Sequence, residues 1–171
     1  MDDVKGIITD IQGFSTDNGP GIRTTVFLKG CALRCPWCHN PETLFPAPQL
    51  LFYPQRCLHC GRCVSRCPRH CHTDDESGHT FQRAVCTACG SCVSVCPAEA
   101  LVMAGKEVRV GEVMSRIMAD KPYYDLSGGG LSLSGGEPLL QAGFCAELAK
   151  RCSFEGIRTL VDTSACVPYS R

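Results

Sequence analysis

Three cysteines stand close together in the segment FLKGCALRCPWCHNPET, with Cys31, Cys35 and Cys38 in a CxxxCxxC spacing. Thiolates at this spacing suit a 4Fe-4S cluster, whose irons take four protein ligands when the cluster only transfers electrons. No fourth cysteine follows at ligand spacing, so one iron would lack a protein ligand. An open coordination position is where a metal centre performs chemistry. We therefore expect the fourth ligand to be a substrate or a cofactor.

Two further runs, CLHCGRCVSRCP and CTACGSCVSVCP, repeat the pattern CxxCxxCxxxCP. This spacing is typical of paired 4Fe-4S clusters in which the last cysteine of each run ligates the other cluster. Gly61 and Gly90 allow the backbone to curl around a cluster, and Pro68 and Pro97 turn the chain away after the last ligand. The pattern predicts one cluster on Cys57, Cys60, Cys63 and Cys96, and another on Cys86, Cys89, Cys92 and Cys67.

Structural zinc is the alternative for these two runs, because paired cysteines also suit a tetrahedral zinc site. Four cysteines per run in this spacing favour iron and sulfur over zinc. A zinc-stapled interaction module would contain zinc and would lack the brown colour of iron–sulfur clusters.

The composition narrows the class of protein. The chain has 171 residues, enough for one domain with a small insert. Its 17 Lys and Arg balance 17 Asp and Glu, which predicts no nucleic-acid partner. The N-terminus has no apolar signal region and no apolar run approaches membrane-spanning length, so we expect a cytoplasmic protein without a membrane partner. In that compartment, the 15 cysteines favour cluster ligation over disulfides.

The apolar periodicity predicts an α/β fold. Strands are expected in GIITDIQGF and in TTVFLKG, the latter delivering the first cysteine loop. After the repeats we expect a helix over 111–119, a strand and turn in LSLSGGEP, an amphipathic helix over 139–152 and a strand in IRTLVDTS. Strand, helix and strand in this order imply a parallel βαβ unit. We expect residues 1–50 and 106–171 to form one domain, interrupted by a cluster insert over 51–105.

The motifs together resemble a known family. CxxxCxxC after a strand resembles the radical S-adenosylmethionine (SAM) superfamily, and SGGEP, residues 134–138, resembles its GGE motif. Within that superfamily, DNGPGIRTTVFLKGCALRCPWCHNPE with a two-cluster insert resembles the glycyl-radical enzyme activating enzymes over nearly the whole chain.

The resemblance implies a reactive cluster on the three loop cysteines and a SAM site formed by Trp37, Gly135, Gly136, Glu137 and Asp162. Trp37 would pack near the adenine, and Asp162 would lie near the methionyl end of SAM. Glu137 and the two glycines would contact the methionyl amino group, because glycine permits close backbone approach and a carboxylate complements an ammonium. The simpler alternatives are a half-buried aromatic for Trp37 and a turn-capping carboxylate for Asp162.

The resemblance also implies an activity and a fold. In the family, a reduced cluster cleaves SAM to methionine and a 5'-deoxyadenosyl radical, which abstracts hydrogen from a glycine of a partner glycyl-radical enzyme. A flavodoxin or ferredoxin would supply the electrons. The implied fold is a partial (β/α) barrel with a ferredoxin-like insert holding two 4Fe-4S clusters, and barrel chemistry lies at the carboxyl ends of the strands. Family members continue through further strands, so we expect a C-terminally truncated barrel.

Two other functions compete with this one. A truncated electron-transfer iron–sulfur protein would use only the insert and would perform no SAM chemistry. A radical SAM enzyme could instead act on a small molecule. The insert itself has two candidate roles, electron relay to the loop cluster or docking of the partner.

The remaining cysteines, histidines and Arg23 have structural interpretations. We expect Cys145 and Cys152 to be small core residues on one helix face. Cys71 and Cys166 are interpreted as spare thiols. We expect a structural ion pair for Arg23, and solvent-facing side chains for His70, His72 and His79.

Overall fold

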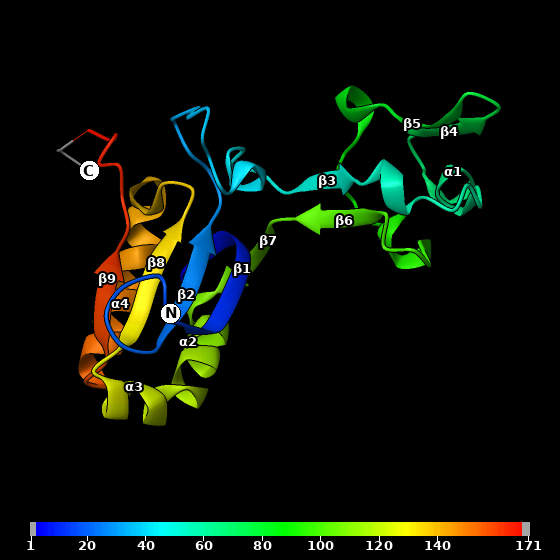
Figure 1. Cartoon of the computed structure of the whole chain (residues 1–171). Helices are drawn as coiled ribbons and strands as arrows, with labels where there is room; N and C mark the ends of the chain where they lie inside the picture. The colour runs from blue at the N-terminus through cyan, green and yellow to red at the C-terminus, as the bar shows by residue number, and fades with distance from the viewer. Residues whose placement is uncertain (1–2, 169–171) are drawn as a thin grey trace. The chain divides into compact units, whose positions relative to one another are not determined.

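The computed structural model describes residues 3–168, and the chain divides into two compact units. The first unit comprises Met1–Ala47 and Gly105–Arg171, and the second comprises Pro48–Ala104. Figure 1 follows the chain from blue to red, and the second unit is one continuous segment that interrupts the first.

A five-stranded sheet forms the centre of the first unit, in the order β7-β1-β2-β8-β9. The strands are β1 (Lys5–Ser15), β2 (Arg23–Leu28), β7 (Lys106–Arg109), β8 (Gly130–Gly135) and β9 (Arg158–Val161). β2, β8 and β9 are parallel, whereas β1 pairs antiparallel with β2 and β7. Leu28 pairs with Gly135, so β2 and β8 end at the same edge of the sheet. The cysteine loop and the SGGEP turn therefore leave the sheet side by side.

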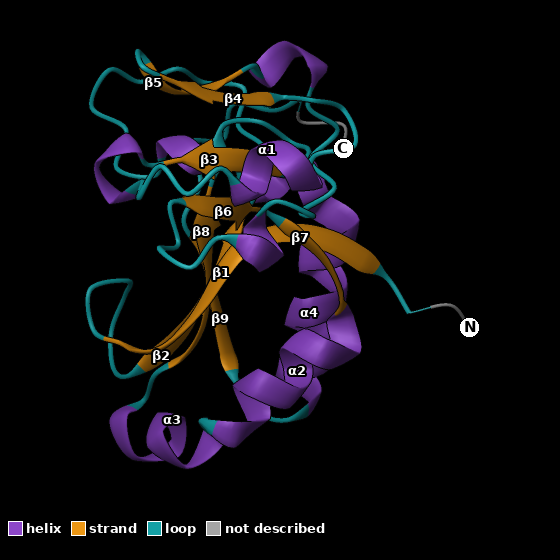
Figure 2. Cartoon of the chain, turned by 90° about the vertical axis from the view of Figure 1, so that its right-hand side faces the viewer, coloured by secondary structure: helices purple, strands orange, loops and turns teal. Residues whose placement is uncertain are grey.

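Helices cover one face of this sheet. They are α2 (Val110–Ala119) and α4 (Ala142–Phe154), which lie against the same face, whereas α3 (Lys121–Ser127) lies at one end of the sheet (Figure 2). β8, α4 and β9 form the predicted parallel βαβ unit, and the helix predicted over 111–119 is confirmed. Within the described residues, no helix combines the length and the apolar character needed to cross a membrane.

The helix predicted over 139–152 begins only at Ala142, because a 3-10 turn, η5 (Pro138–Gln141), precedes it. Pro138 opens this turn, and the carboxylate of Glu137 accepts a hydrogen bond from the backbone N–H of Leu139 at 3.0 Å. A side-chain acceptor just before a helical turn satisfies an N–H that lacks an intrahelical partner. The start of the turn is thus fixed by the same glutamate that belongs to the SGGEP motif.

The core of the first unit lies between the sheet and the helices. It includes apolar side chains of β1, β2, β8, α2 and α4: Ile8, Val26, Leu28, Leu131, Leu133, Val113, Ile117, Phe144 and Leu148. Cys145 and Cys152 are buried in the same core, which confirms the prediction that they are small core residues.

The second unit contains two small antiparallel sheets. β3 (Gln49–Phe52) pairs with β6 (Leu101–Ala104), and β4 (His72–Asp75) pairs with β5 (Gly78–Phe81). The cysteine runs occupy the connections and contain α1 (Arg62–Arg66) and the 3-10 turns η2 (Pro54–Arg56), η3 (Arg83–Val85) and η4 (Val93–Val95). One small cluster of buried apolar residues lies in this unit, formed by Leu50, Cys92 and Leu101 with partly buried neighbours. So small a core favours additional stabilisation from bound metal.

The core of the first unit can be tested with Leu148→Ala. Leu148 is fully buried, so we expect the free energy of unfolding to fall by about 2–5 kcal/mol, measured by urea denaturation. Leu126 is 87% exposed, and Leu126→Ala is the matched control, expected to change stability by about 0.5 kcal/mol or less. Equal effects of the two substitutions would contradict the described packing.

Candidate functional site

The loop after β2 carries the three closely spaced cysteines, and each of them is half-buried. The N–H of Cys31 donates to the carbonyl of Leu44 at 3.1 Å, which ties the loop to the segment around η1 (Pro41–Thr43). The N–H of Cys38 donates to the carbonyl of Cys35, also at 3.1 Å. The loop is therefore closed by its own backbone, while its thiols remain accessible to a cluster.

Lys29 is a buried cation directly before this loop, with 1% of its surface exposed. Its Nζ donates to the backbone carbonyl of Glu42. Burial lowers the pKa of Lys29, and the charge of Glu42 acts in the opposite direction. The sequence analysis missed Lys29, because lysine is mostly exposed in proteins. The available signal was its position directly after the apolar run VFL.

The SGGEP turn after β8 lies against the cysteine loop. The N–H of Glu137 donates to the carbonyl of Gly30 at 2.7 Å, and the N–H of Gly136 donates to the carbonyl of Leu28 at 2.8 Å. A Cβ at Gly136 would lie 2.2 Å from the carbonyl oxygen of Gly30, so only glycine fits there. The structure thus brings together the two motifs that the sequence separates by about a hundred residues.

The carboxylate of Glu137 is buried and bonded to its own chain. The residue is 1% exposed, and its Oε1 accepts from the N–H of Leu139 at 3.0 Å and the hydroxyl of Thr163 at 2.6 Å. Its Oε2 accepts from the N–H and the hydroxyl of Ser164, at 2.9 and 2.6 Å. These four donors fill the usual acceptor capacity of a carboxylate. An amino group would reach this carboxylate only by displacing one of them.

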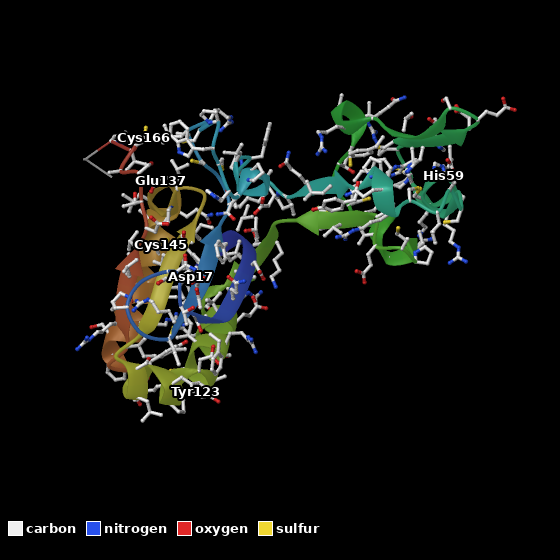
Figure 3. The ribbon with its side chains drawn as sticks, in the orientation of Figure 1. Asp17, His59, Tyr123, Glu137, Cys145 and Cys166 are labelled. Carbon is white, nitrogen blue, oxygen red and sulfur yellow. The ribbon has the colours of Figure 1, made fainter. Side chains whose placement is uncertain are left out.

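This network connects the turn after β8 to the segment after β9. Figure 3 shows Glu137 at the end of the sheet where that segment, which carries Cys166, also runs. Burial by itself raises the pKa of Glu137, but the hydrogen bonds from Ser164, Thr163 and Leu139 outweigh it and lower the pKa below its ordinary value. Glu137 is therefore a buried anion at neutral pH.

The other two residues of the expected SAM site lie on neighbouring segments. Trp37, on the cysteine loop, is 75% exposed and so has an open ring surface. Asp162 directly follows β9, and its Oδ2 accepts from the hydroxyl of Ser134 at 2.8 Å. The N–H of Asp162 donates to the carbonyl of Leu133 at 2.9 Å, which continues the pairing of β8 and β9.

The ion pair expected for Arg23 is wrong, because none is formed with it in the described part of the chain. The guanidinium instead donates to the hydroxyl of Ser132 at 2.6 Å and to the carbonyls of Leu131, Pro20 and Arg158. Arg23 opens β2, where it is buried against β8 and β9, and those strands offer it carbonyl and hydroxyl oxygens instead of carboxylates. Arg23 therefore joins the three parallel strands.

Two cavities in the second unit are lined by the cysteine runs. The first cavity is lined by Cys57, Cys60, Cys63 and Cys96, among other residues. The second cavity is lined by Cys67, Cys86, Cys89, Cys92 and, in addition, Cys71. Each cavity combines three cysteines of one run with the last cysteine of the other run. This donor set fits a 4Fe-4S cluster in each cavity.

The two runs also have equivalent backbones when Cys57 is aligned with Cys86. Residues at corresponding positions share a left-handed conformation that side chains rarely adopt. The φ angles are 52° and 53° at His59 and Ala88, 66° and 76° at Gly61 and Gly90, and 50° and 49° at His70 and Glu99. The internal repeat of the sequence is thus an internal repeat of the structure.

The prediction that His72 and His79 face solvent is wrong. His72 is 2% exposed, with its ring stacked on Phe81 at 5.1 Å between centroids, and His79 is half-buried. The β4–β5 hairpin turns His72 and Phe81, which are paired across it, inward. Nδ1 of His72 lies 3.1 Å from Nε2 of His79, and Nδ1 of His79 lies 3.5 Å from Sγ of Cys57. Nε2 of His72 has no hydrogen-bond partner among the described residues, and His72 lines the second cavity. A buried nitrogen without a partner indicates that the cavity takes a polar occupant.

Comparison with known proteins identifies the family. The family model described as a 4Fe-4S single cluster domain matches residues 17–165. The chain belongs to this family. Membership supports a 4Fe-4S cluster as a cofactor.

Several curated proteins are similar to nearly the whole chain. The benzylsuccinate synthase activating enzyme of Thauera aromatica is 47% identical, over 95% of this chain and 50% of its own length. The choline trimethylamine-lyase activating enzyme of Oleidesulfovibrio alaskensis is 44% identical, over 93% of this chain and 52% of its own length. The (2S)-3-sulfopropanediol dehydratase activating enzyme of Klebsiella oxytoca is 43% identical, over 97% of this chain and 54% of its own length.

These relatives confirm the resemblance to the glycyl-radical enzyme activating enzymes. The chain spans about half the length of the curated relatives it matches.

The buried carboxylate can be tested with Glu137→Gln. Because the pKa of Glu137 lies below its ordinary value of 4.5, its contribution to stability is complete above that pH and is lost as the pH falls through the lowered pKa. Hydrogen bonds to a charged group contribute about 1.5–3 kcal/mol. We therefore expect Glu137→Gln to lower the free energy of unfolding by about that amount at pH 7, and by less at pH 3.5, in urea denaturation.

The matched control is Glu155→Gln, because Glu155 is exposed on the same unit. It should leave stability nearly unchanged at both pH values. A loss in Glu137→Gln that is equal at pH 7 and pH 3.5 would contradict a stabilising anion at this position.

Proposed function

We propose that this chain carries the cluster chemistry of a glycyl-radical enzyme activating enzyme. The enzyme would cleave SAM reductively and remove a hydrogen atom from a glycine of a partner glycyl-radical enzyme. The observation that carries the proposal is the hydrogen bond from the N–H of Glu137 to the carbonyl of Gly30, because it holds the SGGEP turn against the three-cysteine loop. The names of the relatives, each an activating enzyme, support the same activity.

The site residues of this proposal come from three segments at one end of the sheet. Three thiolates of the loop, Cys31, Cys35 and Cys38, would hold a 4Fe-4S cluster and would leave one ligand position of the cluster for SAM. When bound and reduced, this cluster supplies the electron that cleaves SAM to methionine and a 5'-deoxyadenosyl group.

The protein's own contribution is to position SAM. The backbone of Gly135 and Gly136 approaches the methionyl amino group closely, because neither residue has a side chain. Glu137 holds this turn in place through its buried carboxylate and adds negative charge beside the ammonium. The open ring surface of Trp37 would pack against the adenine, and Asp162 would hold the methionyl end.

The second unit holds two further 4Fe-4S clusters in a ferredoxin-like arrangement, which gives three clusters in the chain. The two cysteine-lined cavities support this part of the proposal. A flavodoxin or ferredoxin supplies the electrons. In the first unit, the parallel strands β2, β8 and β9 with α4 correspond to the beginning of a (β/α) barrel, with the site at the carboxyl ends of the strands.

The proposal can be tested by anaerobic reconstitution of the chain. We expect about twelve irons per chain and, after addition of SAM and dithionite, formation of 5'-deoxyadenosine. Cys35→Ala should retain about eight irons and form no 5'-deoxyadenosine, because it removes one ligand of the open cluster. Cys166→Ala is the matched control, since Cys166 is exposed and is not one of the proposed ligands.

Formation of 5'-deoxyadenosine by Cys35→Ala at the rate of Cys166→Ala would overturn the assignment of the reactive cluster. Zinc in place of iron in all three sites would overturn the proposed chemistry altogether.

A further inference from the structure

The second cavity contains one thiol more than a 4Fe-4S cluster needs. Cys71 lines this cavity together with the four proposed ligands and is 2% exposed. Its backbone N–H donates to Sγ of Cys67 at 3.3 Å, so it lies directly beside the ligand contributed by the other run. The first cavity is lined by four cysteines only.

The internal repeat places Cys71 in correspondence with Ala100. Gln82 donates its N–H to the carbonyl of Cys71 at 2.8 Å, and Tyr53, at the position corresponding to Gln82, donates to the carbonyl of Ala100 at the same distance. Ala100 is also 2% exposed and lines the first cavity. The backbone therefore directs this position toward a cluster site in both halves of the repeat.

Packing alone does not require a thiol at this position. Ala100 occupies the corresponding place in the first cavity with a single methyl group. Cys71 adds a sulfur, which is a soft ligand for iron. The partnerless Nε2 of His72, which lines the same cavity, is a second indication that this site accommodates a polar metal-bound group.

We propose that Cys71 is a reserve ligand of the second cluster, which takes over the iron of Cys67 when the Cys67 thiolate is lost. The inference rests on the proposed function, because it requires a 4Fe-4S cluster in the second cavity. In the exchange, the Fe–S bond to Cys67 breaks and an Fe–S bond to Cys71 forms. The thiol proton of Cys71 passes to the released Cys67 thiolate, or to solvent where Cys67 has been removed, and no electron is transferred.

Cys67 is the resting ligand for two reasons. It completes the CxxCxxCxxxCP spacing, in which the fourth cysteine serves the other cluster. In addition, the N–H of Cys71 points at its sulfur, and a hydrogen bond from a backbone N–H favours the charged thiolate form that binds iron.

The test compares the reconstituted full chain with Cys67→Ala, Cys71→Ala and the double substitution. Iron is counted per chain, and the reduction potential and electron paramagnetic resonance spectrum of the second cluster are recorded. We expect about twelve irons in the unchanged chain, in Cys71→Ala and in Cys67→Ala, with a shifted potential or spectrum only in Cys67→Ala. The double substitution should hold fewer irons than Cys67→Ala, because one iron of the second cluster then has no thiol ligand inside the protein.

The first cavity provides the matched control, since it lacks a fifth thiol. Cys96→Ala should hold fewer than about twelve irons per chain, and Cys96→Ala combined with Ala100→Cys should restore about twelve. This gain of iron would not follow from a packing role at this position.

The outcomes separate the two proposals. An unchanged chain with about four irons would overturn the clusters of the second unit, and the reserve ligand with them. An unchanged chain with about twelve irons, and Cys67→Ala with as few irons as the double substitution, would overturn the reserve ligand alone.

Discussion

The hydrogen bond between the N–H of Glu137 and the carbonyl of Gly30 is the interaction on which the candidate site depends. Gly30 precedes the first loop cysteine, and Glu137 ends the GGE motif, so one backbone contact sets the distance between the two motifs. Gly136 makes the contact possible, because any side chain there would overlap the Gly30 carbonyl. The carboxylate of Glu137 then extends the connection to Thr163 and Ser164 after β9. Three segments from three parallel strands are thereby fixed at one end of the sheet, where α/β proteins place their ligands.

The second unit depends on its cysteine-lined cavities more than on an apolar core. Its few buried apolar side chains leave the cysteine-lined cavities as the centre of each half, and metal binding then becomes part of folding. Both halves of the repeat form their cavity with the same backbone conformation, since left-handed residues occur at corresponding positions of both runs. The halves differ where side chains differ. Cys71 corresponds to Ala100 in the alignment of the two runs. The two histidines of the β4–β5 hairpin, His72 and His79, correspond to Leu101 and Leu50, which have no ring nitrogens.

Much of this arrangement could be predicted from the sequence, because cysteine spacing and strand periodicity are local signals. The parallel βαβ unit and the buried cysteines of α4 followed from such patterns. Arg23, Lys29 and His72 could not be assigned in the same way. A charged or polar residue becomes buried only where distant segments supply carbonyls or ring partners, as β8 and β9 do for Arg23. The start of α4 was misplaced for a related reason, since the acceptor that forms the preceding 3-10 turn is the Glu137 carboxylate itself.

The central claim is that the three-cysteine loop and the SGGEP turn form one site for an open cluster and SAM. Anomalous diffraction at the iron edge, from crystals of the anaerobically reconstituted chain grown with SAM, tests it most directly. We expect an iron cluster on Cys31, Cys35 and Cys38, with the methionyl amino and carboxylate groups on its fourth iron beside Gly135, Gly136 and Glu137. Iron in the second unit alone, or SAM bound away from this turn, would contradict it.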